Sequence, residues 1–183
     1  MYYKRSTGTI FAQKLAEPLE WVQWTHHSEG KTHCAECLRL DGCFFTENTH
    51  PFCPHHPYCH CTLEPIDYAY VVKNAAAYSD YGKFDPYLFN TSGIYPHNKE
   101  KLFKEWGYTA EDALWLQTEM EKQAQEKYVS GKYKLGKLNK FRQRIDIEIN
   151  IPRKDKEDTV TFISGWMAEP GGKLKLTTPY GGK

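Results

Sequence analysis

The chain has 183 residues, enough for one medium domain or two small ones. Its hydrophobic content of 40%, charged content of 26% and aromatic content of 15% are typical of a soluble globular protein. No apolar run reaches the length of a membrane span, and a formal net charge of +1 means that any affinity for nucleic acid must come from a local patch.

The first 24 residues hold short apolar groups around Pro18 and predict a brief strand or an irregular entry segment. The first six residues, Met1 to Ser6, lack the apolar core of a signal peptide. We therefore expect no secretion by that route, no membrane partner, and a cytoplasmic or virion-associated location.

All six cysteines lie between Cys34 and Cys61, in a segment with many histidines and little apolar material. Such a segment needs another source of stability, either a metal ion or disulfide bonds. The C-x-x-C spacing of Cys34 and Cys37 is typical of two zinc ligands from one tight turn. A second half of the site is available further on, from His56, Cys59 and Cys61.

Two alternatives to a structural zinc site remain open. Three disulfides would suit a small loop-rich lobe, but the missing signal peptide argues against an oxidising compartment. A catalytic zinc with an open position would need a nearby general base, for which Glu36 and Glu64 are available. Cys43, Cys53 and further histidines exceed the four ligands that one zinc ion requires.

Three stretches of this region carry a resemblance to a known family: Trp24-Thr25, residues 32–42 and residues 56–63. They resemble the C-terminal end of the phage Mu F-like minor head (head morphogenesis) proteins, with a C-x-x-C followed by Leu-Asp-Gly and then an H-P-x-C-x-C ending. The resemblance covers about residues 21–66. It implies phage head or portal proteins as partners. It also implies a zinc ion held by ligands among Cys34, Cys37, His56, Cys59 and Cys61.

Residues 67–82 predict a connecting segment, partly helical around residues 72–77. A short helix is expected over residues 84–89, with Pro86 in its first turn, and another from Asn98 to Trp106, ended by Gly107.

A longer helix is predicted to begin at the capping-box-like residues Thr109 to Asp112 and to stop near Gly131. Its apolar stripe contains Ala113, Leu116, Met120, Ala124 and Tyr128.

The hydrophobic period then changes from 3.6 to 2, which predicts strands. Isoleucines at positions 145, 147, 149 and 151 alternate with polar residues, and two further strands are expected around residues 160–166 and 174–176. The fold class predicted is α+β. A zinc-stabilised, loop-rich lobe (1–66) and a connection (67–82) precede a domain (83–183) of two or three helices on a small antiparallel β-meander.

A basic stretch joins the predicted helix to the predicted sheet. Between Lys127 and Arg144 lie seven basic residues and no acidic one, interleaved with aromatic residues. Lys140, Arg142 and Arg144 are therefore candidate RNA contacts, although a flexible, solvated loop explains the pattern equally well.

His97 and Lys99 flank the start of a predicted helix, where anions bind. An imidazole that titrates near neutrality can act as acid or base, and a lysine in a first helical turn is poorly placed unless it serves a ligand. An ordinary surface histidine and lysine are the simpler explanation.

A second resemblance rests on residues 84–89, 97–103, 106–109, 164–166 and 176–180. These stretches are similar to a small toxin-type domain family that is grouped with the barnase–EndoU–colicin–RelE (BECR) nucleases. The resemblance spans about residues 83–183 and implies helices on an antiparallel sheet that acts on RNA. Its polar pattern corresponds to His97 or Lys99, Ser164, Thr177 and Tyr180.

The leading hypothesis is a phage- or prophage-derived protein whose zinc lobe precedes a metal-independent ribonuclease of the toxin type. RNA, including tRNA, is the expected substrate, and a cognate immunity protein is an expected partner. His97 would be the acid/base, Lys99 and Arg144 would contact phosphate, and Ser164, Thr177 and Tyr180 would contact the substrate or transition state. The rival hypotheses are a non-enzymatic virion-associated structural or interaction protein, and a zinc protein that binds RNA without cutting it.

Overall fold

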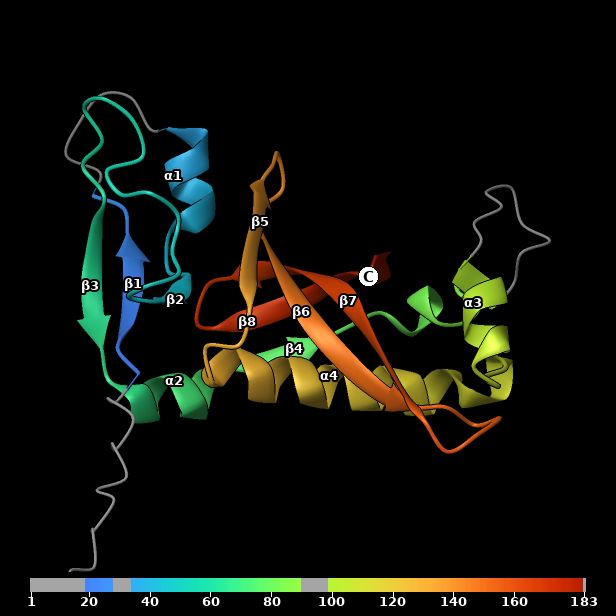
Figure 1. Cartoon of the computed structure of the whole chain (residues 1–183). Helices are drawn as coiled ribbons and strands as arrows, with labels where there is room; N and C mark the ends of the chain where they lie inside the picture. Colours follow the sequence, from blue (N-terminus) through green and yellow to red (C-terminus); the bar gives the residue numbers. More distant parts are fainter. Residues whose placement is uncertain (1–18, 28–33, 90–98, 183) are drawn as a thin grey trace, which may run out of the picture.

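A computed structural model describes residues 19–27, 34–89 and 99–182 (Figure 1). Its elements in chain order are β1 (Trp21–Thr25), α1 (Ala35–Leu40), β2 (Phe44–Thr46), β3 (Thr62–Ile66), α2 (Tyr68–Asn74), β4 (Ala76–Tyr78), the 3₁₀ turn η1 (Tyr81–Lys83), α3 (Lys99–Glu105), the 3₁₀ turn η2 (Ala110–Asp112), α4 (Ala113–Val129), β5 (Lys134–Leu138), β6 (Gln143–Pro152), β7 (Thr159–Glu169) and β8 (Lys173–Gly182). No helix among the described residues is both long and apolar enough to cross a membrane.

The first sheet contains three strands in the order β2-β1-β3. The central strand β1 is antiparallel to both neighbours, and pairs Val22 with Phe45 and Trp24 with Leu63. Aromatic and β-branched residues suit such a pleated, buried position, and Trp24 is fully buried. Of the brief strand or irregular entry segment predicted for residues 1–24, the structure shows a strand, β1, while residues 1–18 lie outside the described ranges.

The second sheet contains five strands in the order β4-β8-β7-β6-β5. Neighbours from β8 to β5 are antiparallel, and the edge strand β4 runs parallel to β8. The predicted alternation in β6 is confirmed, because its isoleucines at positions 145, 147, 149 and 151 are fully buried. The residues between them consequently face the opposite side of the sheet.

Helix α4 lies along the sheet, as Figure 1 shows below β6 and β7. Its buried residues are the predicted stripe, Ala113, Leu116, Met120, Ala124 and Tyr128. Thr109 and Asp112 form the predicted capping box, although it encloses η2, immediately before α4. Gly131 follows the helix with a φ of 67°, a conformation that glycine adopts without steric cost.

The predicted fold class is confirmed: the structure is α+β, with helices against a mainly antiparallel sheet.

Three local expectations from the sequence differ from the structure. The basic stretch contains a strand, β5, because Lys134–Leu138 can pair with the strongly strand-forming β6, and lysines are tolerated on an edge. Residues 67–82 are partly helical as predicted, but the helix, α2, lies earlier than residues 72–77, and the segment also contains β4, which extends the second sheet, and the start of η1. Residues 84–89 form consecutive turns after η1, since the ring of Pro86 disfavours a helical conformation at the preceding Asp85.

The two sheets share one continuous apolar core. The hydroxyl of Tyr128 in α4 donates to the carbonyl of Phe44 in β2 at 2.7 Å, and the Trp21 and Tyr128 rings meet edge to face at 5.1 Å. Tyr133 extends this contact, because its hydroxyl accepts from the Thr46 N–H at 2.8 Å. The predicted lobe 1–66 and domain 83–183 are thus packed together through buried aromatic side chains.

This junction predicts the effect of removing one hydroxyl. Tyr128→Phe leaves the buried Phe44 carbonyl without its phenol donor, so we expect a loss of about 1–2 kcal/mol in the free energy of unfolding. Urea titration followed by tryptophan fluorescence measures it. Tyr68→Phe is the matched control, because Tyr68 is 47% exposed. An equal effect of both changes would contradict a buried hydrogen bond between the sheets.

Candidate functional site

The first candidate site is the cysteine-rich loop region beside α1. Cys34 is the N-cap of α1 and Cys37 lies in its first turn, so the helix start brings both thiols to one place. The second half of the site is a tight turn in which the Cys59 N–H donates to the His56 carbonyl at 3.1 Å. Cys61 lies two residues further on, immediately before β3.

Two groups of potential ligand atoms meet at Cys37. One contains Cys34, Cys37 and His56, the other contains Cys37, Cys59 and Cys61, and the atoms within each group lie within 4.8 Å of one another. The Cys37 sulfur is 3.4 Å from Nε2 of His56 and 3.6 Å from the Cys59 sulfur. Two thiolates bound tetrahedrally at about 2.3 Å from an ion lie roughly 3.7 Å apart. This centre can therefore bind a metal ion.

The thiol pKa values explain why a cation would stabilise the centre. Burial raises the pKa of Cys37, and the neighbouring Cys61 and Cys59 sulfurs raise it further. Burial also opposes ionisation of Cys59, but backbone N–H donors from Cys61 and His55 outweigh it and lower its pKa to about 7. A backbone N–H of Cys37 lowers the pKa of Cys34. A bound cation would supply the charge that Cys37 needs to ionise between these thiols.

The surplus residues of this region have other contacts. Cys43 is fully buried, and its thiol donates to the Ala168 carbonyl at 3.7 Å. The Cys53 thiol donates to the Cys61 carbonyl at 3.4 Å. All six cysteines are free thiols in the structure, so the alternative of three disulfides is not the state it describes. Of the two possible general bases, Glu36 binds His55 at 2.8 Å and Glu64 accepts from Thr62.

The second candidate site lies on the open face of the second sheet, the side away from α4. Strand register places Lys134, Asp146, Gly165 and Thr178 in one row across β5, β6, β7 and β8. Arg144 shares this face two residues before Asp146, and donates from Nε to Oδ1 of Asp146 at 2.6 Å. The buried isoleucines of β6 fix this arrangement, because their alternation directs Arg144 and Asp146 outward.

Three basic side chains, which we call the cation cluster, meet around Thr177 and Thr178 of β8. Lys83 donates to the Thr177 carbonyl at 3.0 Å, and Lys99 donates to Oγ1 of Thr178 at 2.8 Å. The third member, Arg144, extends over Gly165 of β7, where a β-carbon would lie 2.7 Å from Nη2 of Arg144 and 3.0 Å from Cγ2 of Thr178. Arg144 pairs with Asp146, whereas Lys83 and Lys99 have no carboxylate partner in the part of the chain that the structure describes. The cluster therefore carries uncompensated positive charge, which favours an anion.

Lys99 is further oriented by Tyr87. Its Nζ lies 3.4 Å from the Tyr87 hydroxyl and 5.4 Å from the ring centroid. The Tyr87 ring is 43% exposed, so it offers a partly open aromatic surface beside the ammonium group. A cation next to an accessible aromatic ring is a combination that single-stranded nucleic acid uses for phosphate contact and base stacking.

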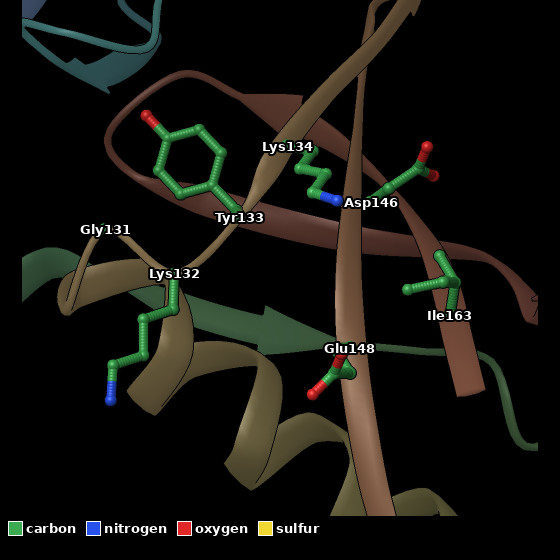
Figure 2. Close-up of a pocket in the computed structure, with 7 residues that line it drawn as sticks. All are labelled: Gly131, Lys132, Tyr133, Lys134, Asp146, Glu148 and Ile163. Carbon is green, nitrogen blue, oxygen red and sulfur yellow. The ribbon is translucent and has the colours of Figure 1, made fainter. Parts of the chain in front are cut away.

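A cavity of about 400 Å³ adjoins the cation cluster on the open face (Figure 2). Figure 2 shows Lys134 on β5, Asp146 and Glu148 on β6, and Ile163 on β7 around it, with Lys132 following α4. Gly131 and Tyr133 complete the lining. Because Asp146 also binds Arg144, the cavity and the cation cluster share one carboxylate.

The predicted catalytic residues lie in different parts of the structure. His97 lies outside the described residues, and Lys99 is in the cation cluster. Ser164 is fully buried on the isoleucine face, where its hydroxyl donates to the Ile147 carbonyl and accepts from the Trp166 indole at 2.7 Å. The expected solvent-facing position of Ser164 is therefore wrong, and its hydroxyl lies on the opposite side of the sheet from Arg144 and Asp146.

Thr177 and Tyr180 serve mainly structural contacts. The Thr177 hydroxyl donates to the Gly165 carbonyl at 2.7 Å, next to an irregularity in the pairing of β7 and β8. The half-buried Tyr180 ring packs 6.4 Å from Trp106 and 5.9 Å from Phe162. The residue that Lys99 contacts is instead Thr178, one position beyond the predicted threonine.

The predicted RNA contacts divide into three environments. Lys140 is exposed at the β5–β6 hairpin tip, with Nζ 5.1 Å from the ring of the 66% exposed Phe141. Arg142 instead donates to the Arg39 carbonyl at 3.0 Å and ties the hairpin to α1. Arg144 lies on the open face as a member of the cation cluster.

Sequence reasoning missed Lys83, Asp146 and Thr178. The alternation in β6 was a usable signal for Asp146, because it places this carboxylate on the same face as Arg144. Lys83 and Thr178 come together only through the packing of η1 and α3 against β8, for which the sequence carries no local pattern.

A family model described as "Domain of unknown function (DUF6883)" matches residues 73–183, which is more than half of the chain. No curated protein and no solved structure matches the chain. The matched residues include β4 to β8, α3 and α4, and so the whole second sheet with its cation cluster.

The metal centre predicts a difference between two cysteines. Cys37→Ser removes the ligand common to both groups, so we expect the purified variant to lose most of its bound metal and to unfold at a lower temperature. Elemental analysis and thermal scanning measure the two effects. Cys53→Ser, outside both groups, should retain the metal. Equal metal content in both variants would remove Cys37 from the ligand set.

Proposed function

The chain belongs to the DUF6883 family, a domain family of unknown function, and from this premise we propose that its second sheet binds and cleaves RNA. The observation that carries the proposal is the cation cluster, in which Lys99 from α3 donates to Thr178 and Nη2 of Arg144 from β6 lies over Gly165, the residue paired with Thr178. Two cations from separate elements around one hydroxyl-bearing residue form a suitable receptor for a phosphate group.

Cleavage of RNA by its own 2′-hydroxyl requires a base, an acid and positive charge on the phosphate. The 2′ oxygen attacks phosphorus and its proton passes to the base, while the bond to the 5′ oxygen breaks and the acid protonates that oxygen. The products are a 2′,3′-cyclic phosphate and a 5′-hydroxyl. In the proposal His97, two residues before Lys99, supplies acid/base catalysis, and Lys99 and Arg144 stabilise the transferring charge.

The surrounding residues suggest how a strand of RNA would continue from this point. The exposed Lys140 and Phe141 offer a cation and a stacking surface at the hairpin tip. Thr177 and Tyr180 contribute to this surface indirectly. The Thr177 hydroxyl bonds to the Gly165 carbonyl and shapes β8, and the Tyr180 ring packs against Phe162. tRNA is included among the proposed substrates because the resemblance to BECR toxins implies it.

For the metal centre we propose a structural zinc ion. Thiolate and imidazole donors select zinc among the common divalent ions, and a closed set of four protein ligands is typical of structural sites. Cys37 is the shared ligand of the two groups, and the remaining three ligands come from Cys34, His56, Cys59 and Cys61. When bound, zinc would stabilise the junction of α1 with the loop before β3.

The proposed origin is a phage or prophage, which rests on the resemblance of residues 21–66 to Mu F-like minor head proteins. Phage head or portal proteins would then be partners of this lobe, and a cognate immunity protein would protect a host from the RNase. The proposed location is the cytoplasm or the virion.

The RNase proposal is tested on total RNA and on purified tRNA, in EDTA and without added magnesium. The zinc content of each sample is measured after the assay, so that loss of the structural ion is not mistaken for a metal requirement in cleavage. We expect fragments that end in 2′,3′-cyclic phosphate. His97→Ala and Lys99→Ala should each slow cleavage by about 10²-fold or more, because each removes a group that acts on the transition state.

Lys101→Ala is the matched control, since Lys101 is an exposed lysine in the same helix. It should leave the cleavage rate within about twofold of that of the unchanged protein. Intact RNA at high protein concentration, with zinc retained and the protein folded, would contradict the enzymatic proposal. Binding without cleavage would favour an RNA-binding protein. The absence of both binding and cleavage would favour a structural virion protein.

A further inference from the structure

Arg144 crosses the open face above three glycines that belong to three different strands: Gly136 of β5, Gly165 of β7 and Gly181 of β8. A β-carbon placed on Gly136 would lie 2.9 Å from Cγ of Arg144. One on Gly165 would lie 2.7 Å from Nη2, and one on Gly181 would lie 2.9 Å from Nη2. Any side chain at these positions would therefore displace the arginine.

Asp146 fixes the remaining freedom of the guanidinium group. Its Oδ1 accepts from Nε of Arg144 at 2.6 Å, and the Asp146 and Arg144 side chains are 29% and 31% exposed. The contact uses the inner N–H of the guanidinium. The outer amino groups make no hydrogen bond to the part of the chain that the structure describes. These amino groups are the ones that bind an oxyanion in the paired, parallel geometry.

An ordinary surface ion pair does not require glycines beneath the arginine side chain. Exposed pairs lose much of their attraction to solvent and to the motion of the long side chain. Here the glycines allow the side chain to lie flat on the backbone of its neighbours, with Nη2 beside Thr178 and hence beside the Lys99 contact. The arrangement reduces the entropy that Arg144 would lose on binding a ligand.

We propose that Asp146 and the glycines Gly136, Gly165 and Gly181 are positioning residues that hold Arg144 ready to receive an RNA phosphate. The inference rests on the proposed function, because it assumes that RNA is the ligand of the cation cluster. Asp146 does not touch the substrate. It acts through Arg144 by occupying Nε and fixing the direction of Nη1 and Nη2.

The positioning role and net charge alone predict opposite changes in RNA affinity when Asp146 loses its charge. Removing a carboxylate beside an anion site should raise affinity for RNA if net charge alone matters. If Asp146 positions Arg144, Asp146→Asn should instead weaken binding about tenfold and slow cleavage by at least as much. Glu157→Gln is the control for net charge, since the exposed Glu157 lies in the turn between β6 and β7, outside the candidate site. It should leave affinity unchanged or slightly raised.

Gly181→Ala tests the role of the glycines without altering charge. Its methyl group would lie 2.9 Å from Nη2 of Arg144 and at least 3.4 Å from the next nearest atom, so binding should weaken as in Asp146→Asn while the melting temperature changes little. Gly171→Ala should show the reverse pattern. Gly171 has a φ of 75° and no atom within 4 Å of an added β-carbon, so the variant should be less stable but bind normally.

The measurement uses the full chain and 2′-O-methyl RNA, which cannot be cleaved by internal attack, with anisotropy recorded at several salt concentrations. Arg144→Ala should reduce the salt slope by about one phosphate contact. Asp146→Asn should add nothing to the effect of Arg144→Ala, because both act through one group.

The possible outcomes separate this inference from the RNase proposal. If the protein binds RNA without cutting it, the RNase proposal fails while the positioning role is still decided by affinity. If Asp146→Asn binds as tightly as the unchanged protein, or if its effect adds fully to that of Arg144→Ala, the positioning role is overturned even in an active enzyme. Absence of RNA binding by the unchanged protein overturns both.

Discussion

The packing of β6 against α4 is the constraint on which the rest of the second sheet depends. Burial of the four β6 isoleucines against the apolar stripe of α4 fixes the strand in one register. A shift by one residue would place Arg144 and Asp146 in the core and expose every isoleucine, at a cost that the domain could not sustain. The same burial therefore determines the fold and the residues that face a ligand.

Elements with strong periodicity are predictable from the sequence. The stripe of α4 and the alternation of β6 are local patterns that burial alone enforces, so each is predicted with the correct face. β5 is not, because Lys134–Leu138 has a composition that favours solvent and becomes a strand only by pairing with β6. Ser164 shows the same limit, since an indole hydrogen bond makes a polar residue compatible with the core.

The candidate sites differ in how much of each can be recognised in the sequence. The candidate metal ligands lie close together along the chain. Their spacings and the resemblance to minor head proteins select Cys34, Cys37, His56, Cys59 and Cys61, and the structure brings these residues into two adjoining groups. The cation cluster draws on η1, α3 and β6, and its members are separated by long stretches of chain. Such a site is a product of tertiary packing, and the sequence can suggest only its individual residues.

The shared aromatic core has a consequence for how this protein can be divided. The family match begins at residue 73, but the stretch before it supplies Trp21 and Phe44, which cover Tyr128 of α4. A fragment that starts at the family boundary would expose this tyrosine and the apolar groups around it, a surface prone to self-association. The unit of sequence similarity is therefore smaller than the unit that shares one apolar core, and fragments for expression should begin before β1.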